Sequence, residues 1–117
     1  MKHKVAVYGT LKKGYPNSHL LDKAEFLGKE RLTSLTLYDL GAYPGARLKS
    51  SGGVLVEIYA VNDQILEELD ILEDYIPSLP DQSLYLRKSL GTRFGLCWVY
   101  IYNQPVSSGQ VISSGNW

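Results

Sequence analysis

Val54-Leu55-Val56-Glu57-Ile58-Tyr59-Ala60-Val61 is the stretch that decides the fold, because it carries the strongest strand signal in the chain. β-Branched and aromatic residues fill it, and this composition is typical of strands. A turn at residues 50–53 precedes it, and Asn62 follows it. The stretch therefore predicts a strand that leads directly into a helix.

The residues after Asn62 predict a short amphipathic helix over 63–74. Residues advance by about 100° along a helix, so the apolar side chains share one arc; they are Ile65, Leu66, Leu69 and Leu72. Glu73 falls inside this arc, almost directly beneath Leu66, where a leucine is expected. An inward-facing acid near a helix C-terminus loses hydration, which disfavours its ionised form. Such a placement suits a general acid or base that works near neutral pH.

Further apolar runs that end at turns predict strands within residues 5–8, 24–39, 84–90 and 94–102, and the segment 24–39 can hold one long strand or two short ones. A second short helix is expected over 19–23, capped by Asn17 or Ser18. Residues 41–45 are expected to form a loop, and residues 105–115 a polar tail.

Many strands and only two short helices favour an α+β fold. We expect a small mixed, mainly antiparallel β-barrel or highly curved sheet, with helices packed against its openings. A Rossmann-like fold is disfavoured, since too few helices are available to cover a parallel sheet. The length predicts a single domain over residues 1–117.

The composition of the chain argues against some classes of binding partner. Twelve basic and twelve acidic side chains cancel, so no overall field attracts nucleic acid or an anionic membrane. No apolar run reaches the roughly 20 residues of a membrane helix or forms a signal-peptide core. We therefore expect a soluble, cytoplasmic protein. The single cysteine, Cys97, lies in a predicted strand and is interpreted as a buried structural thiol rather than a nucleophile.

The segment Tyr8-Gly9-Thr10-Leu11, after the first predicted strand, is a candidate binding site. A strand that stops at Gly9 leaves successive backbone N–H groups unpaired. Such a nest binds carboxylates or oxyanions, and a glycine permits close approach. The alternative is an ordinary strand-to-turn transition flanked by solvated lysines.

Other polar residues offer weaker candidates. Glu57 interrupts an apolar strand and needs a partner if it is buried, so a structural role is favoured over a catalytic one. Arg87 is a candidate partner for Glu73, and this pair would keep the acid ionised and weaken its case for proton transfer. His3 and His19 have no second metal ligand nearby in sequence, and no phosphate- or dinucleotide-binding motif is present. We therefore expect neither a metal nor a cofactor.

A series of ordered segments resembles the gamma-glutamylcyclotransferase-like superfamily. It opens with Val-Ala-Val-Tyr-Gly-Thr-Leu-Lys-Lys-Gly at 5–14, and the later segments are 17–21, 41–46, 56–59, 69–73, 84–87 and 114–117. The resemblance covers essentially the whole chain. It is nearest to the small bacterial-type members and to gamma-glutamylamine cyclotransferases.

The resemblance implies a compact mixed barrel and a cofactor-independent enzyme that releases 5-oxoproline from a small γ-glutamyl compound. It implies that Glu73 is the catalytic acid and base, and that Tyr8, Gly9, Thr10 and Leu11 form the substrate-binding loop. Two departures from the family pattern are Asp74, where glycine is usual, and Val56, where glycine is common.

Two other functions stay open at this point. A binding module would use the same pocket without turnover, and a structural or interaction domain would be favoured if residues 8–11 and Glu73 lay far apart. The identity of the leaving amine and the oligomeric state are left open as well.

Overall fold

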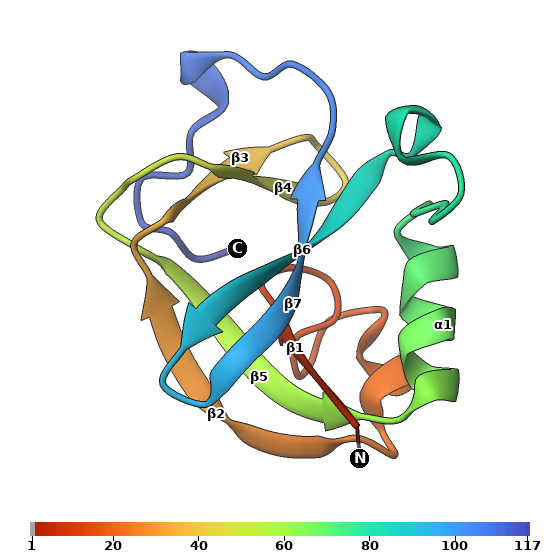
Figure 1. Cartoon of the computed structure of the whole chain (residues 1–117). Coiled ribbons are helices and arrows are strands. Elements are labelled where there is room, and N and C mark those ends of the chain that lie inside the picture. Colours follow the sequence, from red (N-terminus) through yellow and green to blue (C-terminus); the bar gives the residue numbers. More distant parts are fainter. Residues whose placement is uncertain (1) are drawn as a thin grey trace.

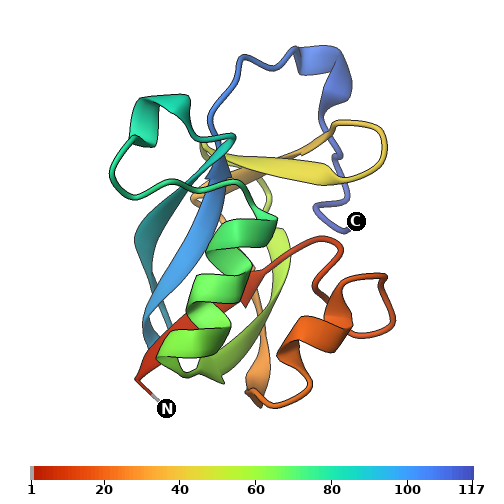
Figure 2. The same cartoon turned by 90° about the vertical axis from the view of Figure 1, so that its right-hand side faces the viewer.

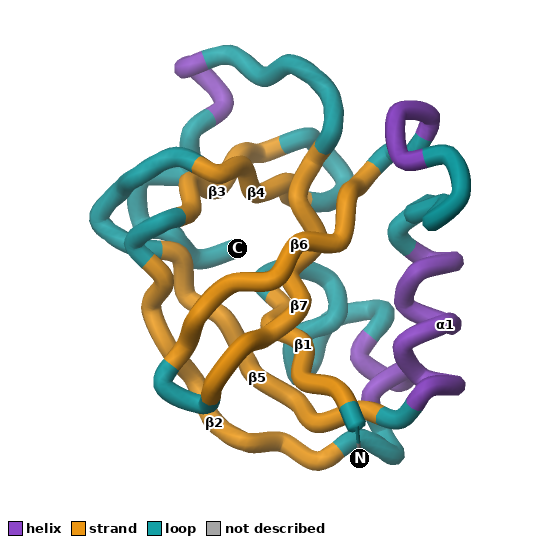
Figure 3. Tube along the Cα trace, viewed as in Figure 1, coloured by secondary structure: helices purple, strands orange, loops and turns teal. Residues whose placement is uncertain are grey.

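The computed structural model describes residues 2–117, which fold around one curled sheet (Figure 1). Its seven strands are β1 (His3–Val7), β2 (Glu25–Leu32), β3 (Leu35–Asp39), β4 (Pro44–Leu48), β5 (Val54–Val61), β6 (Tyr85–Thr92) and β7 (Gly95–Tyr102). The described helices are α1 (Asp63–Leu72) and the 3-10 helices η1 (Ser18–Leu21), η2 (Pro80–Gln82) and η3 (Ser108–Gln110). Figure 3 shows the strands forming a half-barrel wall with the helices outside it. The expected α+β class and curled, mainly antiparallel sheet are confirmed.

The sheet divides at β7. This strand pairs with β6 along its whole length in antiparallel fashion. Its other edge pairs in parallel with β1 at Trp98 and with β4 at Ile101. The pairings β1–β5, β2–β5 and β3–β4 are antiparallel. Because β1 and β4 share one edge of β7, the end of β1 and the start of β4 face each other across a gap.

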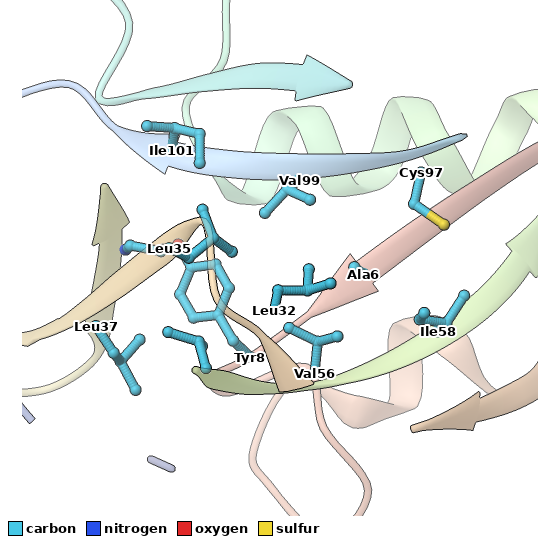
Figure 4. Packing of buried hydrophobic residues seen from close by; sticks show 12 residues of the cluster. Ala6, Tyr8, Leu32, Leu35, Leu37, Val56, Ile58, Cys97, Val99 and Ile101 are labelled. Atoms are coloured by element: carbon cyan, nitrogen blue, oxygen red, sulfur yellow. Dashed lines mark hydrogen bonds between the residues drawn. The ribbon is translucent and has the colours of Figure 1, made fainter. Parts of the chain in front are cut away.

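Both faces of β5 are buried, which explains why this strand is almost continuously apolar. Along β5, Val56 and Ile58 join a cluster inside the curl, whereas Tyr59 and Val61 join a second cluster beneath α1. Figure 4 shows the first cluster, in which Cys97 supplies a buried thiol, as predicted.

Helix α1 covers the second cluster. Asn62 caps it by accepting a hydrogen bond from the N–H of Ile65 at 2.8 Å. The helix ends at Leu72, two residues earlier than predicted, with Glu73 as its C-cap. Leu72 was predicted on the buried arc but is 37% exposed, because it lies at the helix end beside a cavity.

Other sequence predictions need correction. Residues 41–45 include the start of β4, because Pro44 pairs with Asp39 across a hairpin. The helix predicted over 19–23 is the 3-10 helix η1 instead. Its Asn17 side chain donates to Thr10 Oγ1 rather than capping the helix. The predicted polar tail is docked on β3, since the N–H of Ile112 donates to the carbonyl of Leu37 at 2.8 Å.

Within residues 2–117, none of the helices has the length and hydrophobicity needed to cross a membrane.

Candidate active site

A cavity of about 390 Å³ opens where β1 gives way to β4 beside β7. Its wall includes residues 8–11 after β1, residues 42–44 at the start of β4, and residues 72–74 at the end of α1. Figure 2 shows α1 ending near the β3–β4 hairpin and beside the loop that leaves β1. The structure thus brings Glu73 and all four predicted loop residues to one cavity.

Glu73 lines this cavity at the C-terminal end of α1. Its backbone N–H still donates to the carbonyl of Leu69 at 3.0 Å, so the helix holds the residue in place. Burial, followed by the negative charge of Asp74, raises the pKa of Glu73 to about 7. A carboxyl group with this pKa can both accept and donate a proton near neutral pH.

Arg87 does not pair with Glu73. Its Nη1 lies 2.7 Å from Asp70 Oδ2, and Asp70 also accepts a hydrogen bond from the hydroxyl of Tyr100 at 2.6 Å. The guanidinium lies over the rings of Trp98 and Tyr75, with its carbon at 4.6 and 5.3 Å from their centroids. The alternative in which Arg87 keeps Glu73 ionised is therefore wrong.

Asp74 forms the turn that ends α1. Its φ of 52° is left-handed, and the N–H of Tyr75 donates to the carbonyl of Asp70 at 2.9 Å. The N–H of Asp74 donates to the carbonyl of Ile71 at 3.2 Å. These two bonds make a Schellman motif, whose left-handed position usually holds glycine. Aspartate tolerates this conformation better than most residues, so Asp74 keeps the turn and adds a second carboxylate to the cavity wall.

The loop at residues 8–11 presents unpaired backbone donors. Within residues 2–117, the N–H groups of Gly9, Thr10 and Leu11 donate to no protein acceptor. The loop is closed by a bond from the N–H of Lys12 to the carbonyl of Gly9 at 3.0 Å. Gly9 is needed here, since an added Cβ would lie 2.7 Å from Pro44 Cγ. Consecutive unpaired N–H groups of this kind form a nest for an anion.

Tyr8 joins the strands that border the gap. Its hydroxyl donates to the carbonyl of Tyr100 at 2.7 Å and accepts from the N–H of Ala46 at 3.2 Å. Burial raises the pKa of Tyr8 well above its usual value, so the hydroxyl stays protonated. Because this hydroxyl is engaged by the sheet, Tyr8 contributes to the cavity wall through its ring and backbone.

Glu57 lies outside the cavity wall. It is buried, and its Oε1 accepts hydrogen bonds from the N–H of Lys13 at 2.9 Å and from the hydroxyl of Tyr59 at 2.8 Å. These bonds tie the loop after β1 to β5. The contacts favour the structural role over the catalytic one.

Asn17, Tyr43 and Tyr85 line the wall, although no role in a site was predicted for them from the sequence. The hydroxyl of Tyr85 donates to the carbonyl of Pro44 at 2.8 Å, which fixes the start of β4. Tyr43 lies in a predicted loop and Tyr85 in a predicted strand, and no local pattern places them at one cavity. No group of three or more potential metal-ligating side chains forms within residues 2–117.

Known proteins resemble this chain over nearly its full length. The sequence profile of the family described as "Gamma-glutamyl cyclotransferase, AIG2-like" matches residues 5–117. A Vibrio cholerae protein with the provisional name gamma-glutamylcyclotransferase is 41% identical over 118 residues, which cover 100% of this chain and 96% of the relative. "Gamma-L-glutamyl-butirosin B gamma-glutamyl cyclotransferase" from Niallia circulans is 33% identical over 105 residues, covering 84% of this chain and 65% of that protein. The solution structure of ytfP from Escherichia coli, 35% identical, superposes with a TM-score of 0.75 over 97% of this chain and 95% of that chain.

Proposed function

Because the chain belongs to the gamma-glutamyl cyclotransferase, AIG2-like family, we propose that it converts a γ-glutamyl amine or peptide into 5-oxoproline and a free amine. One observation carries this proposal: Glu73, whose pKa is raised to about 7, lines the same cavity as the unpaired N–H groups of residues 9–11. The Niallia circulans relative, whose name states a γ-glutamyl cyclotransferase activity, supports the reaction class.

The proposed reaction is an intramolecular acyl transfer. The α-amine of the γ-glutamyl group attacks its own γ-carbonyl carbon, which closes a five-membered ring. The amide bond to the leaving amine then breaks. Nucleophile and electrophile belong to one molecule, so the cavity needs only to hold the substrate in its folded conformation. All atoms of both products come from the substrate.

Glu73 moves the proton in this mechanism. Its carboxylate accepts the proton that the α-amine loses on attack, and the resulting acid delivers that proton to the departing nitrogen. A pKa near 7 places both forms within reach at neutral pH. The N–H groups of residues 9–11 stabilise the substrate α-carboxylate or the oxyanion that develops at the γ-carbonyl.

The substitution Glu73→Gln tests the proposal, because glutamine keeps the shape of the side chain but cannot accept the proton. We expect 5-oxoproline release, measured by mass spectrometry, to fall by about 10²- to 10⁴-fold. Glu67→Gln is the matched control, since Glu67 is an exposed acid of the same helix and lies outside the cavity wall. A Glu73→Gln variant that turns over at the parent rate would show that Glu73 is not the proton carrier.

The physiological partner in this proposal is a small γ-glutamyl molecule, and we place the protein in the cytoplasm. The single cysteine, Cys97, is buried and unpaired, which supports that location because small secreted domains commonly depend on disulfides. Tight binding of γ-glutamyl amines without 5-oxoproline release would favour the binding module instead.

A further inference from the structure

We propose that the cavity selects γ-glutamyl compounds whose leaving amine carries a second positive charge, and that Asp74 is the specificity-determining residue that recognises this charge. The inference rests on the proposed function, and it specifies the half of the substrate that the reaction itself leaves open.

Among the described residues, the ionisable groups of the cavity wall include acids but no bases. Glu73 and Asp74 supply carboxylates, and no lysine, arginine or histidine of residues 2–117 lines the wall. These two carboxylates therefore favour a ligand group that carries positive charge. A second negative charge on the ligand would lie near two acids with no cation to offset it.

Basic side chains near the loop are engaged elsewhere. Lys12 Nζ donates to Asn116 Oδ1 at 2.8 Å, and Lys13 Nζ lies 3.9 Å from the ring centroid of Phe26. Arg87 is held by Asp70. The nest at residues 9–11 can accommodate the α-carboxylate that every γ-glutamyl substrate carries. A further carboxylate on the leaving group, as in a γ-glutamyl α-amino acid, would find no partner.

The position of Glu73 sets the direction of the leaving group. The departing nitrogen must lie at Glu73 to receive its proton, so the rest of the leaving group occupies the adjacent wall. Asp74 is exposed there, together with Leu72 and Tyr43, which are 37% and 40% exposed. An alkyl chain can pack against these two apolar side chains, and a terminal ammonium group can then reach Asp74.

The turn itself does not call for a carboxylate. A left-handed φ at the end of a helix is met best by glycine and next by asparagine. An aspartate at this position keeps a conformational cost and adds negative charge at the mouth of the cavity. The geometry of the turn does not explain the negative charge of Asp74, whereas recognition of a cation does.

Three γ-glutamyl amides of similar length and different charge test the inference: those of 1,4-diaminobutane, butylamine and 4-aminobutanoate. Their leaving groups end in an ammonium, a methyl and a carboxylate. We expect kcat/KM for 5-oxoproline release to be about two- to fivefold higher for the diamine than for butylamine, as for an exposed ion pair, and lower still for the carboxylate. The difference should shrink in about 1 M salt, which screens exposed charges.

Asp74→Asn is the decisive variant, because asparagine tolerates the left-handed turn and lacks the charge. Comparing the three substrates within one variant cancels any change in the reactivity of Glu73. We expect the diamine preference to fall to nearly onefold in Asp74→Asn and to persist in the control Glu67→Gln. Equal kcat/KM for the diamine and butylamine in the parent, or a preference unchanged by Asp74→Asn, overturns the inference.

A different outcome identifies failure of the proposed function. If the parent releases no 5-oxoproline from any of the three amides, the cyclotransferase proposal fails. NMR titration of the parent protein with the same amides then still decides the charge preference. Tighter binding of the diamine supports selection by the cavity, and equal affinities overturn it.

Discussion

Glu73 is an acid whose neighbours leave it without a counter-charge. Asp70 holds the nearby cation of Arg87, and Asp74 adds a negative charge beside it. Tyr8 and Tyr85 also line the cavity, and burial raises the pKa of each, so their hydroxyls stay neutral. Tyr100 contributes a third neutral hydroxyl, which is bonded to Asp70. Desolvation therefore governs the carboxyl of Glu73, and its protonated form is favoured up to neutral pH.

The pH dependence of the reaction should reflect the raised pKa of Glu73. We expect kcat/KM for 5-oxoproline release to fall as the pH drops below about 7, because protonated Glu73 cannot accept the proton of the α-amine. Asp74→Asn removes the negative charge beside Glu73, which is the second cause of its raised pKa. The acid limb of the pH–rate profile should therefore move to lower pH. A pH–rate profile of both proteins is the measurement, and superimposable acid limbs would contradict the role of Asp74.

The stability of the fold should depend on the same carboxyl. The pKa of Glu73 rises from 4.5 to about 7 on folding, so the folded state binds more protons than the unfolded state between these values. The free energy of unfolding should therefore decrease by at most about 3 kcal/mol as the pH rises through this window. Glu73→Gln should lose this part of the pH dependence. Urea unfolding of parent and variant at pH 5 and pH 8 measures it, and parallel changes in the two proteins would refute it.

At the scale of the element, the end of α1 both positions Glu73 and strains the next residue. The Schellman bonds fix the turn, and the Arg87–Asp70–Tyr100 network anchors the last full turn of the helix to β6 and β7. The carboxylate of Glu73 is thus held by contacts that do not involve the carboxylate itself. Asp74 carries the cost of a left-handed backbone in this arrangement.

Asp74→Gly should stabilise the protein by about 0.5–1 kcal/mol, since glycine adopts the left-handed conformation at little cost, and the gain exceeds its extra unfolded-state entropy. Thermal or urea unfolding at pH 5, where Glu73 is largely protonated, measures the effect with little contribution from charge. Asp74→Ala is the control, because it removes the carboxylate and keeps the Cβ. Equal stability of the alanine and glycine variants would show that the backbone is not strained.

At the scale of the whole molecule, the loop after β1 is held from two sides. Glu57 of β5 accepts the N–H of Lys13, and the C-terminal segment holds Lys12 and Tyr15. The hydroxyl of Tyr15 donates to the main-chain oxygen of Trp117 at 2.7 Å, and Trp117 packs against the cluster inside the curl. The last residues of the chain therefore support a loop about a hundred positions earlier.

Lys12→Met should loosen this support while keeping an apolar stem of similar length. Loss of the bonds from Lys12 Nζ to Asn116 and Trp117 should lower the free energy of unfolding by about 1–2 kcal/mol. We expect faster hydrogen exchange at residues 9–15 and 114–117. We also expect KM to rise and kcat to change less than KM. Lys13→Met is the matched control, because the Lys13 side chain rests on Phe26 and its N–H bond to Glu57 survives. Equal exchange in the two variants would exclude a role for the C-terminal segment.

Local pattern predicted the strand at 54–61, the helix after Asn62 and the inward position of Glu73, because periodicity depends on neighbours in the chain. A start of β4 at Pro44 was not predicted, since β4 also depends on the pairing of Ala46 with Ile101 of β7, far along the chain. The partner of Arg87 was likewise decided by packing, because Asp70 and Glu73 both lie near the end of one helix. By itself, the sequence determined most of the strands, the helix after Asn62 and that Glu73 faces inward. Only the tertiary structure decided that β1 and β4 share an edge of β7, and this gap creates the cavity because side chains from distant segments meet there.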